Sequence, residues 1–574
     1  MNLKHLLNLR IGAAMDAAGV TDAPAIVKQA QRAEFGHYQA NGIMGAAKKH
    51  NMNPRELAQK VLTAAGEDDD LELEIAGPGF INITLSREFL GRELKQLLKA
   101  TPEDRENSKP RKIVVDYSAP NLAKEMHIGH LRPTTIGDTA VRILEYLGHD
   151  VIRANHVGDW GAQFGSLLAY MDQLAEQGQQ LSSELKDLEK FYQAASALFR
   201  SDEVFATKAR GYVVKLQAGD EKCISLWREF IAESIKHCQT VYARLNITLT
   251  PGDIMAESAY NDFLGIVVEE LDEKGLLIES DGAKCVFLDE FVGKDDKPLP
   301  AIIQKSDGGY PYMATDLAAA RYRAGDLNVD EALYFVGAPQ QLHLRQVFAV
   351  ATAAGYISES QQFKHLPFGS VLKTDGTPFK TRDGAAVKLI DVLDESVDRA
   401  YKLVDEKNQS LSESDKKDVA RIVGIGAIKY AELSKNRTTD YIFDWDTMLS
   451  FEGNTAPYLQ YAYTRIRSIF RREEIEANQL DGEFSLEETA DISLAVKLLQ
   501  FEETIASVLD DYQANILCNY LFELASIFMS FYEACPVLNA QEPLRTSRLM
   551  LCHLTAETLR QGLNLLGIET VEQM

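Results

Sequence analysis

Apolar residues recur at helical spacing in the C-terminal third of the chain. Within residues 491–512 (DISLAVKLLQFEETIASVLDDY) they fall on one helical face, at Leu494, Leu498, Phe501, Ile505 and Val508. Helical patterns dominate from about residue 415 onward, and we expect Pro536 to end this helical region. The pattern predicts an all-α C-terminal region.

The N-terminal pattern differs. The first residues (MNLKHLLNLRIGAAMDAAG) predict an amphipathic helix and not a signal peptide, since no small-residue cleavage pattern follows an apolar core. Residues 71–76 (LELEIA) and 80–85 (FINITL) are strand-like and flank a Gly-Pro-Gly turn. A polar stretch, TPEDRENSKPRK, follows and is typical of a linker. We therefore predict an N-terminal α+β domain over residues 1–110.

A strand, a helix and a second strand follow within about 45 residues. Residues 112–117 (KIVVDY) and 150–154 (DVIRA) predict buried strands, and a helix is expected from about His127 to Leu147, with Gly148 at its C-terminus. This βαβ unit predicts a Rossmann-type α/β domain with a parallel sheet over residues 111–385. A mostly helical, acidic insertion is expected at about 165–300, after which ALYFVGA is strand-rich.

Composition limits the function classes. The chain has 574 residues, which favours three or four domains, and 45% apolar with 25% charged residues is ordinary for a globular protein. The formal net charge of −25 argues against a polyanionic partner. If RNA is the partner, basic residues must concentrate on one surface.

The six cysteines form no C-x-x-C pair and no Cys/His cluster with zinc spacing. We therefore expect no structural zinc, no protein-only metal site, free thiols and a reducing cytoplasmic location. The sequence contains no run of about 18 or more apolar residues, so we predict no membrane-spanning helix.

The sequence His127-Ile128-Gly129-His130 follows the first predicted strand. Two imidazoles three positions apart at a helix start can reach one ligand, and free N–H groups there favour phosphate. Gly129 lets a flat base approach the backbone. The pattern favours a site for ATP phosphates and adenine at the carboxyl end of a parallel strand. The alternative is two histidines that only cap or pack at a helix end.

Residues 115–138 (VDYSAPNLAKEMHIGHLRPTTIGD), followed by NHVGDWGAQFG, resemble the first signature of bacterial arginyl-tRNA synthetases, and the likeness extends from FGHYQANG near residue 35 to the C-terminal TLRQGLNLLGIETVEQM. The resemblance implies a class I enzyme that activates L-arginine with ATP to arginyl-adenylate and transfers it to tRNA(Arg). It also implies ATP binding by Lys124, His127, Gly129 and His130, with Mg²⁺ carried by ATP. We expect a monomer.

The second class I signature, K-M-S-K, is degenerate here. In residues 376–384 (GTPFKTRDG), Phe379, Lys380 and Thr381 stand at its last three positions, so the second lysine is missing. In similar arginyl enzymes a lysine just before H-I-G-H is thought to compensate; here that is Lys124, and Lys380 and Arg382 would add charge. The alternative is an ordinary surface turn.

A guanidinium ligand requires planar, paired acceptors, which carboxylates supply. The resemblance assigns arginine binding to Glu257, Tyr312, Asp316 and Gln340, with Ser118 and Asn121 at the α-amino and carboxylate ends. Tyr312 precedes Asp316 by four residues, so one helical turn could present both, and the ring could stack on the guanidinium. Taken singly, each acidic residue is more often a surface charge.

Residues 458–472 (YLQYAYTRIRSIFRR) interleave aromatic and basic residues, which suits unpaired bases and phosphates, although an exposed basic helix would look the same. Tyr461, Arg465, Ser468 and Arg472 share one face, which Arg467 and Arg471 flank. The resemblance places anticodon binding from about residue 450 in a helical domain, 386–574, with Tyr458, Tyr461, Arg465 and Met574 near the tRNA.

Phe80 and Asn82 match the family's aromatic-x-Asn pair for a base of the tRNA D-loop. The alternative is a core phenylalanine beside an outward polar residue on a strand.

Three other functions compete. A cysteinyl enzyme of the same class would need a zinc site that the cysteine spacing does not provide. A catalytically silent tRNA-binding relative fits the degenerate second signature but not the intact H-I-G-H. A nucleotidyltransferase would not need the helical C-terminal half.

Overall fold

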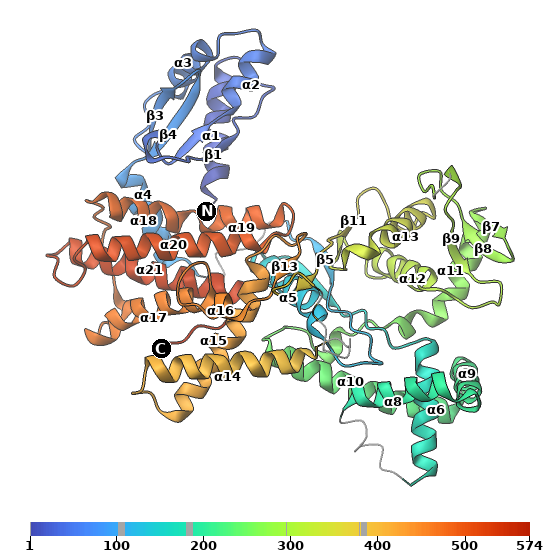
Figure 1. Cartoon of the computed structure of the whole chain (residues 1–574). Coiled ribbons are helices and arrows are strands. Elements are labelled where there is room, and N and C mark those ends of the chain that lie inside the picture. Colours follow the sequence, from blue (N-terminus) through green and yellow to red (C-terminus); the bar gives the residue numbers. More distant parts are fainter. Residues whose placement is uncertain (1, 102–108, 179–186, 294–295, 378, 380–386) are drawn as a thin grey trace. The chain divides into compact units, whose positions relative to one another are not determined.

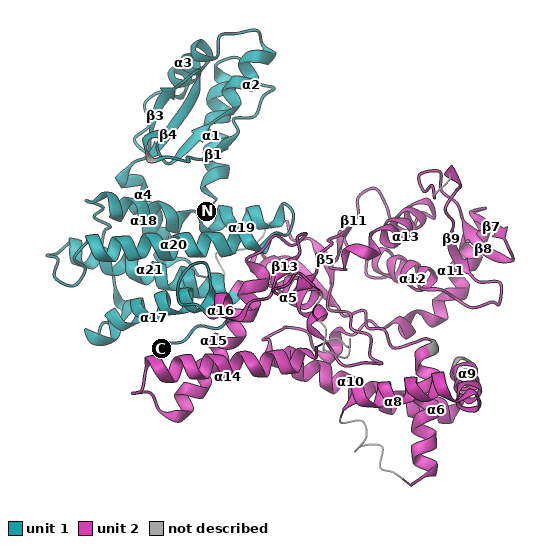
Figure 2. Ribbon diagram, viewed as in Figure 1, with its two compact units in different colours: residues 1–105, 450–564, 569–574 teal, residues 106–449, 565–568 magenta. Residues whose placement is uncertain are grey.

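The computed structural model describes residues 2–101, 109–178, 187–293, 296–377, 379 and 387–574. The chain divides into two compact units (Figure 2): unit 1 comprises residues 1–105, 450–564 and 569–574, and unit 2 comprises residues 106–449 and 565–568. Each unit therefore combines segments that are distant in sequence.

The N-terminal part of unit 1 is an antiparallel sheet of order β1-β2-β4-β3 with helices beside it (Figure 1). The predicted strand pair is confirmed at the expected residues. The elements are α1 Leu3–Ala17, β1 Val27–Gln29, β2 Tyr38–Ala40, α2 Gly42–Lys49, α3 Pro54–Ala65, β3 Leu71–Ala76, β4 Phe80–Leu85 and α4 Arg87–Lys99.

The remainder of unit 1 is helical, as predicted, with α17 Ala456–Arg472, α18 Thr489–Leu499, α19 Phe501–Leu509, α20 Ala514–Ala534 and α21 Leu544–Leu565. The five apolar residues of 491–512 are all buried, but the segment is two helices that meet at Gln500. Pro536 follows the end of α20, yet α21 resumes the helical region after it, so the expectation that Pro536 ends that region was wrong.

Helix α20 is long and apolar enough to span a membrane, with a mean hydropathy of 1.3 over its most apolar window. Half of that window is buried inside the protein, and Leu517, Leu521, Leu524 and Phe528 are fully covered. These side chains give α20 the character of the core helix of a bundle.

The centre of unit 2 is a parallel sheet of order β11-β10-β5-β6, with β5 Lys112–Asp116, β6 Asp150–Ala154, β10 Glu331–Tyr334 and β11 Gln362–His365. Helix α5 (Leu131–Tyr146) connects β5 to β6, and α13 (Gln341–Ala353) connects β10 to β11. Because the connections run outward in opposite directions from β5 and β10, a crevice is expected at the carboxyl ends of these two strands. The predicted βαβ unit is confirmed.

The insertion begins with α6 Ala162–Glu176, α8 Leu188–Ser201, α9 Glu203–Gln217, α10 Glu221–Arg244 and α11 Asn261–Glu273. Its end is not helical: β7 Leu277–Ser280, β8 Ala283–Val286 and β9 Ala301–Gln304 form an antiparallel sheet. Asp281 and Gly282 both have positive φ, the conformation of a two-residue hairpin turn. The Asp-Gly pair was a hairpin signal that the helical prediction missed.

The rest of unit 2 contains α12 Tyr312–Ala324, β12 Val371–Leu372, α14 Leu389–Lys407, α15 Glu413–Leu433, β13 Tyr441–Ile442 and α16 Trp445–Met448. A buried ion pair, Arg132 Nε to Glu432 Oε1 at 2.6 Å, joins α5 to α15. The start of α5 is thereby tied to α15, which follows the parallel sheet in the sequence. The predicted boundary at residue 385 stays a prediction.

Candidate active site

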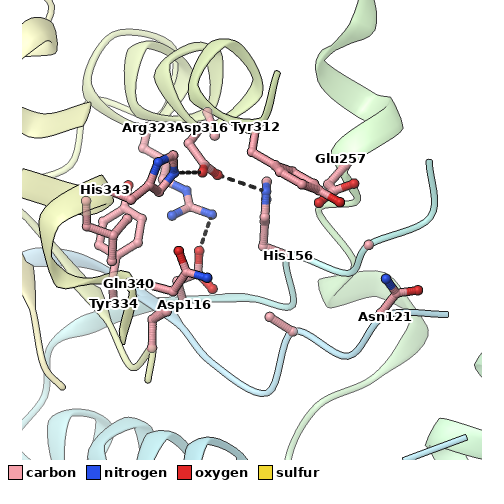
Figure 3. A pocket seen from close by; sticks show the side chains of 15 residues that line it. Asp116, Asn121, His156, Glu257, Tyr312, Asp316, Arg323, Tyr334, Gln340 and His343 are labelled. Carbon is pink, nitrogen blue, oxygen red and sulfur yellow. Dashed lines mark hydrogen bonds and ion pairs between the residues drawn. The ribbon is translucent and has the colours of Figure 1, made fainter. Parts of the chain in front are cut away.

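A cavity of about 480 Å³ opens at the carboxyl ends of the parallel strands (Figure 3). Its wall comes from the ends of β5 and β10, from the loops after β5, β6 and β10, from the turn at Glu257, from α12 and from the start of α13. The polar lining groups are Asp116, Asn121, His156, Glu257, Tyr312, Asp316, Arg323, Tyr334, Gln340 and His343. The crevice expected from the strand order is therefore a polar pocket.

Asp316 is the carboxylate of this cavity that two histidines contact. His343 Nε2 lies 2.5 Å from Asp316 Oδ2, and His156 Nε2 lies 3.4 Å from Oδ1. Burial alone would raise the pKa of Asp316, but the hydrogen bonds from His156 and His343 outweigh it and hold that pKa well below its usual range. Asp316 is thus a fixed, ionised acceptor on the first turns of α12.

Glu257 has the opposite character. Burial, with a smaller contribution from nearby Asp316 and Asp159, raises the pKa of Glu257 to about 7. The backbone of its turn is held because Asp159 accepts hydrogen bonds from the N–H of Ser258 at 2.9 Å and its hydroxyl at 2.5 Å. The charge of His156 offsets only part of this burial, so Glu257 holds its proton more readily than Asp316 does.

Arg323 lies beneath these groups and is fully buried. Its Nη2 is 2.7 Å from Asp116 Oδ2, and its guanidinium lies 4.8 Å from the centre of the Tyr334 ring. Because Asp116 and Arg323 compensate each other, Asp316 and Glu257 are the carboxylates left for a ligand.

Five of the six residues expected to bind arginine line this one cavity: Asn121, Glu257, Tyr312, Asp316 and Gln340. Ser118 is not in the cavity wall. It has a φ of +69°, and its Oγ lies 2.8 Å from both the Tyr242 hydroxyl and Thr134 Oγ1. In this geometry Ser118 anchors the loop after β5, and its assigned contact with substrate stays a prediction.

The H-I-G-H residues form a 3-10 turn, Ile128–His130, before α5 begins at Leu131, so the helix starts later than expected. His127 Nδ1 accepts a hydrogen bond from Gly129 N–H at 3.1 Å, and His130 Nδ1 accepts one from His127 N–H at 3.0 Å. Both Nδ1 atoms are acceptors, so each neutral ring carries its proton on Nε2. The turn therefore offers two N–H donors.

The electrostatics keep these rings neutral. Burial lowers the pKa of His130 to about 3, and burial with the nearby Lys124 lowers the pKa of His127. The ring centroids are 4.0 Å apart. Two neutral donors on one turn suit an anionic oxygen without adding a second positive charge.

The second signature is only partly described, because Lys380, Thr381 and Arg382 lie outside the described residues. The chain after it pairs with the H-I-G-H turn: Ile128 N–H donates to Val387 O at 3.0 Å, and Leu389 N–H donates to Met126 O at 2.9 Å. Phe379 packs against Phe443, with ring centroids 5.3 Å apart. Residues 387–389, which follow the second signature, are therefore joined to the first signature.

In unit 1, Tyr461 on α17 is 41% exposed, whereas Tyr458 is half-buried with its ring 5.6 Å from that of Phe522. Arg465 lies 5.3 Å from the Tyr532 ring centre. Arg467 is not a free flanking charge, since its Nε bonds Glu572 at 3.0 Å. Tyr461 is thus the most exposed aromatic residue of this helix, and its contact with tRNA stays a prediction.

The C-terminal residue Met574 is half-buried. Glu572, two residues earlier, accepts a hydrogen bond from the Tyr463 hydroxyl at 2.7 Å, which fastens the end of the chain to α17.

Asn82 is buried, with its Oδ1 2.8 Å from Gln39 Nε2, while Phe80 is half-buried. The alternative of an outward-facing polar residue at position 82 is therefore wrong. The proposed contact with a D-loop base stays a prediction.

The sequence reasoning missed His156, His343, Arg323 and Asp116. His156 and His343 contact the Asp316 carboxylate, and Arg323 and Asp116 form the buried ion pair. His156 follows β6 in the NHVGDWG motif, and Asp116 ends β5, so both had a positional signal. No signal in the sequence marked Arg323, because an arginine near a helix C-terminus is ordinary. Among residues with described positions, no group of three metal-ligating side chains occurs.

Comparison with known proteins agrees with this geometry. The catalytic-domain family described as tRNA synthetases class I (R) matches residues 93–445, and the fold and the H-I-G-H turn define a class I aminoacyl-tRNA synthetase. The arginyl tRNA synthetase N-terminal domain matches residues 2–85, and the DALR anticodon binding domain matches residues 459–574. The chain belongs to the arginyl-tRNA synthetase family.

Close relatives and solved structures cover the whole chain. The arginine–tRNA ligases of Hahella chejuensis and a Marinomonas species are 56% and 53% identical, each over 100% of both chains. The arginyl-tRNA synthetase structure from Plasmodium falciparum has a TM-score of 0.85 at 29% identity, over 100% of this chain and 99% of that one. The Thermus thermophilus structure has a TM-score of 0.81 at 26% identity, over 100% of both.

Proposed function

We propose that this chain attaches L-arginine to tRNA(Arg) in two steps. ATP and arginine react in line at the α-phosphate, the arginine carboxylate displaces pyrophosphate, and arginyl-adenylate forms. The arginyl group then passes to the 2′-hydroxyl of the terminal adenosine and AMP leaves. The observation that carries the proposal is the cavity that joins Asp316, Glu257 and Tyr312 at the carboxyl edge of the sheet.

In this proposal the guanidinium binds between Asp316 and Glu257, and the exposed ring of Tyr312 covers its face. Asn121 and Gln340 hold the α-amino and carboxylate ends, with Ser118 supporting them. A lysine substrate would bind more weakly, because its ammonium is a point charge that cannot bond two carboxylates through a planar fork.

The phosphates of ATP would bind the Nε2–H groups of His127 and His130, with Gly129 leaving room for adenine. Lys124, Lys380 and Arg382 would supply the positive charge that the degenerate second signature lacks. Mg²⁺ would arrive with ATP, since Mg²⁺ usually keeps water and phosphate ligands.

The first test is arginine-dependent ATP–pyrophosphate exchange, with and without tRNA(Arg). We expect exchange only when tRNA is present, as the family resemblance implies. Exchange with another amino acid would contradict the arginine assignment. If neither condition gives exchange while tRNA still binds, the protein is a silent tRNA-binding relative.

The affinity for arginine is expected to fall at acidic pH. Glu257 must be ionised to accept a cation, and burial raises its pKa to about 7. Affinity for arginine is therefore full well above pH 7 and decreases as pH falls through about 7, by up to about tenfold per unit. Titration calorimetry of arginine at pH 6, 7 and 8 measures this, and the Glu257→Gln variant should lose the dependence. An unchanged slope in that variant would assign the titration to another group.

Tyr461→Ala is expected to weaken tRNA binding by about 5- to 100-fold, because base stacking on an aromatic ring contributes roughly 1–3 kcal/mol. Filter binding at fixed salt measures the change. The Kd for arginine should not change, and Tyr401→Ala, on α14 in unit 2, serves as the matched control. An equal loss in both variants would show that Tyr461 has no specific contact.

The proposal also includes a monomer and a cytoplasmic location. The cytoplasmic location rests on the cysteine pattern, and sedimentation equilibrium across a range of concentrations tests the monomer. A concentration-dependent mass would exclude a monomer.

A further inference from the structure

Lys124 has an unusual partner. It is exposed in the loop between β5 and α5, three residues before His127, and its Nζ lies 4.4 Å from the centre of the Tyr192 ring. Within the described part of the chain, no carboxylate forms an ion pair with it. The ring attracts the ammonium through its quadrupole without neutralising its charge.

Tyr192 belongs to α8 of the helical insertion, and the start of α8 is tied to the H-I-G-H region. Lys388 Nζ lies 2.9 Å from Asp187 Oδ1, the N-cap of α8, and 3.1 Å from Glu125 Oε2. Glu125 is the neighbour of Lys124. The main chain on either side of Lys388 pairs with the H-I-G-H segment. One lysine thus fixes α8 against the segment that carries Lys124.

The far side of α8 is anchored by packing. Phe191, the neighbour of Tyr192, is buried with its ring 4.9 Å from Tyr170 of α6 and 5.9 Å from Phe230 of α10. Successive helical residues point about 100° apart, so Phe191 can lie in the core while Tyr192 faces the loop. The ring of Tyr192 is therefore presented from a rigid support.

We infer that Tyr192 is a positioning residue for Lys124 in adenylate formation, an inference that rests on the proposed contribution of Lys124 to ATP binding. The ring restricts a long, flexible side chain that would otherwise lose rotamer freedom when it meets a phosphate. A carboxylate at this place would compete with phosphate for the ammonium, whereas a neutral ring does not. The insertion thereby takes part in the ATP site through one side chain.

The test is a double-mutant cycle in arginine-dependent pyrophosphate exchange with tRNA present. Tyr192→Leu keeps an apolar side chain without a ring, and we expect kcat/KM for ATP to fall by about 3- to 10-fold while the KM for arginine is unchanged. Tyr192→Phe keeps the ring and should restore most of the activity. In a Lys124→Ala background, Tyr192→Leu should cause no further loss.

Tyr170→Leu is the matched control, since it loosens the packing of Phe191 that anchors α8 but leaves the Tyr192 ring beside Lys124. Its effect on exchange should be equal in the wild-type and Lys124→Ala backgrounds. Thermal unfolding confirms that each variant folds, and Tyr192→Met is a second ring-free variant. Wild-type exchange in Lys124→Ala would overturn the role of Lys124 itself. The role of Tyr192 would be overturned if Lys124→Ala lowers exchange while Tyr192→Leu leaves it normal. It would also be overturned if the losses of the two single variants multiply in the double variant.

Discussion

Asp316→Asn should reduce kcat/KM for arginine by roughly 30- to 5,000-fold, because truncating one member of a buried, hydrogen-bonded charge pair costs about 2–5 kcal/mol. Asparagine keeps the shape of the side chain but removes the charge that His156, His343 and the guanidinium all require. Exchange kinetics with arginine varied at saturating ATP and tRNA measure the effect, which should leave the KM for ATP unchanged.

The matched control is Asp326→Asn. Asp326 is exposed just beyond the same helix and does not line the cavity. It should behave like the unmodified protein. A comparable loss in both variants, or a wild-type Kd for arginine in Asp316→Asn, would show that Asp316 is not the guanidinium acceptor.

His127→Asn is expected to lower kcat for adenylate formation by about 10²- to 10³-fold, the usual effect of removing one donor from developing negative charge. Asparagine is a good N-cap residue, so its Oδ1 can replace Nδ1 as the acceptor for Gly129 N–H. What is lost is the Nε2–H group that we propose donates to the phosphates of ATP. Single-turnover formation of arginyl-adenylate measures the step, and the KM for arginine should stay near its original value.

His149→Asn provides the comparison for this second prediction. His149 Nδ1 also accepts a backbone hydrogen bond, from Arg111 N–H at 3.1 Å, but it lies at the other end of α5. It should retain normal adenylate formation. If both histidine variants lose activity equally, the effect is structural and the H-I-G-H imidazoles are not phosphate donors.

The charges in the cavity explain why we expect replacement of Asp316 to weaken arginine binding more than replacement of Glu257. Asp116 is neutralised by Arg323 at 2.7 Å, and Glu257 is half protonated near pH 7. Asp316 is the carboxylate that stays fully charged across this range. It therefore supplies most of the attraction for a cation at neutral pH.

Local patterns were sufficient for much of the fold. The β-branched run of β5, the Gly148 terminus of α5 and the Gly-Pro-Gly turn between β3 and β4 each act within a few residues, so the strand pair and the βαβ unit could be predicted directly. The H-I-G-H motif and the alignment of Asp316 one turn after Tyr312 likewise depend on local spacing. Errors occurred where local signals compete, as in the Asp281-Gly282 hairpin inside a region that otherwise favours helix.

The sequence alone determined the class of fold, the position of the H-I-G-H turn and five of the residues that line the cavity. Tertiary structure alone decided the protonation and charge of those residues. His343 reaches Asp316 from the start of α13 and His156 reaches it from the loop after β6. Arg323 of α12 pairs with Asp116 of β5, and Tyr192 of α8 reaches Lys124. Such pairs join residues 27 to 207 positions apart. Their energies depend on burial and on distances of a few ångströms, which no periodicity along the chain encodes.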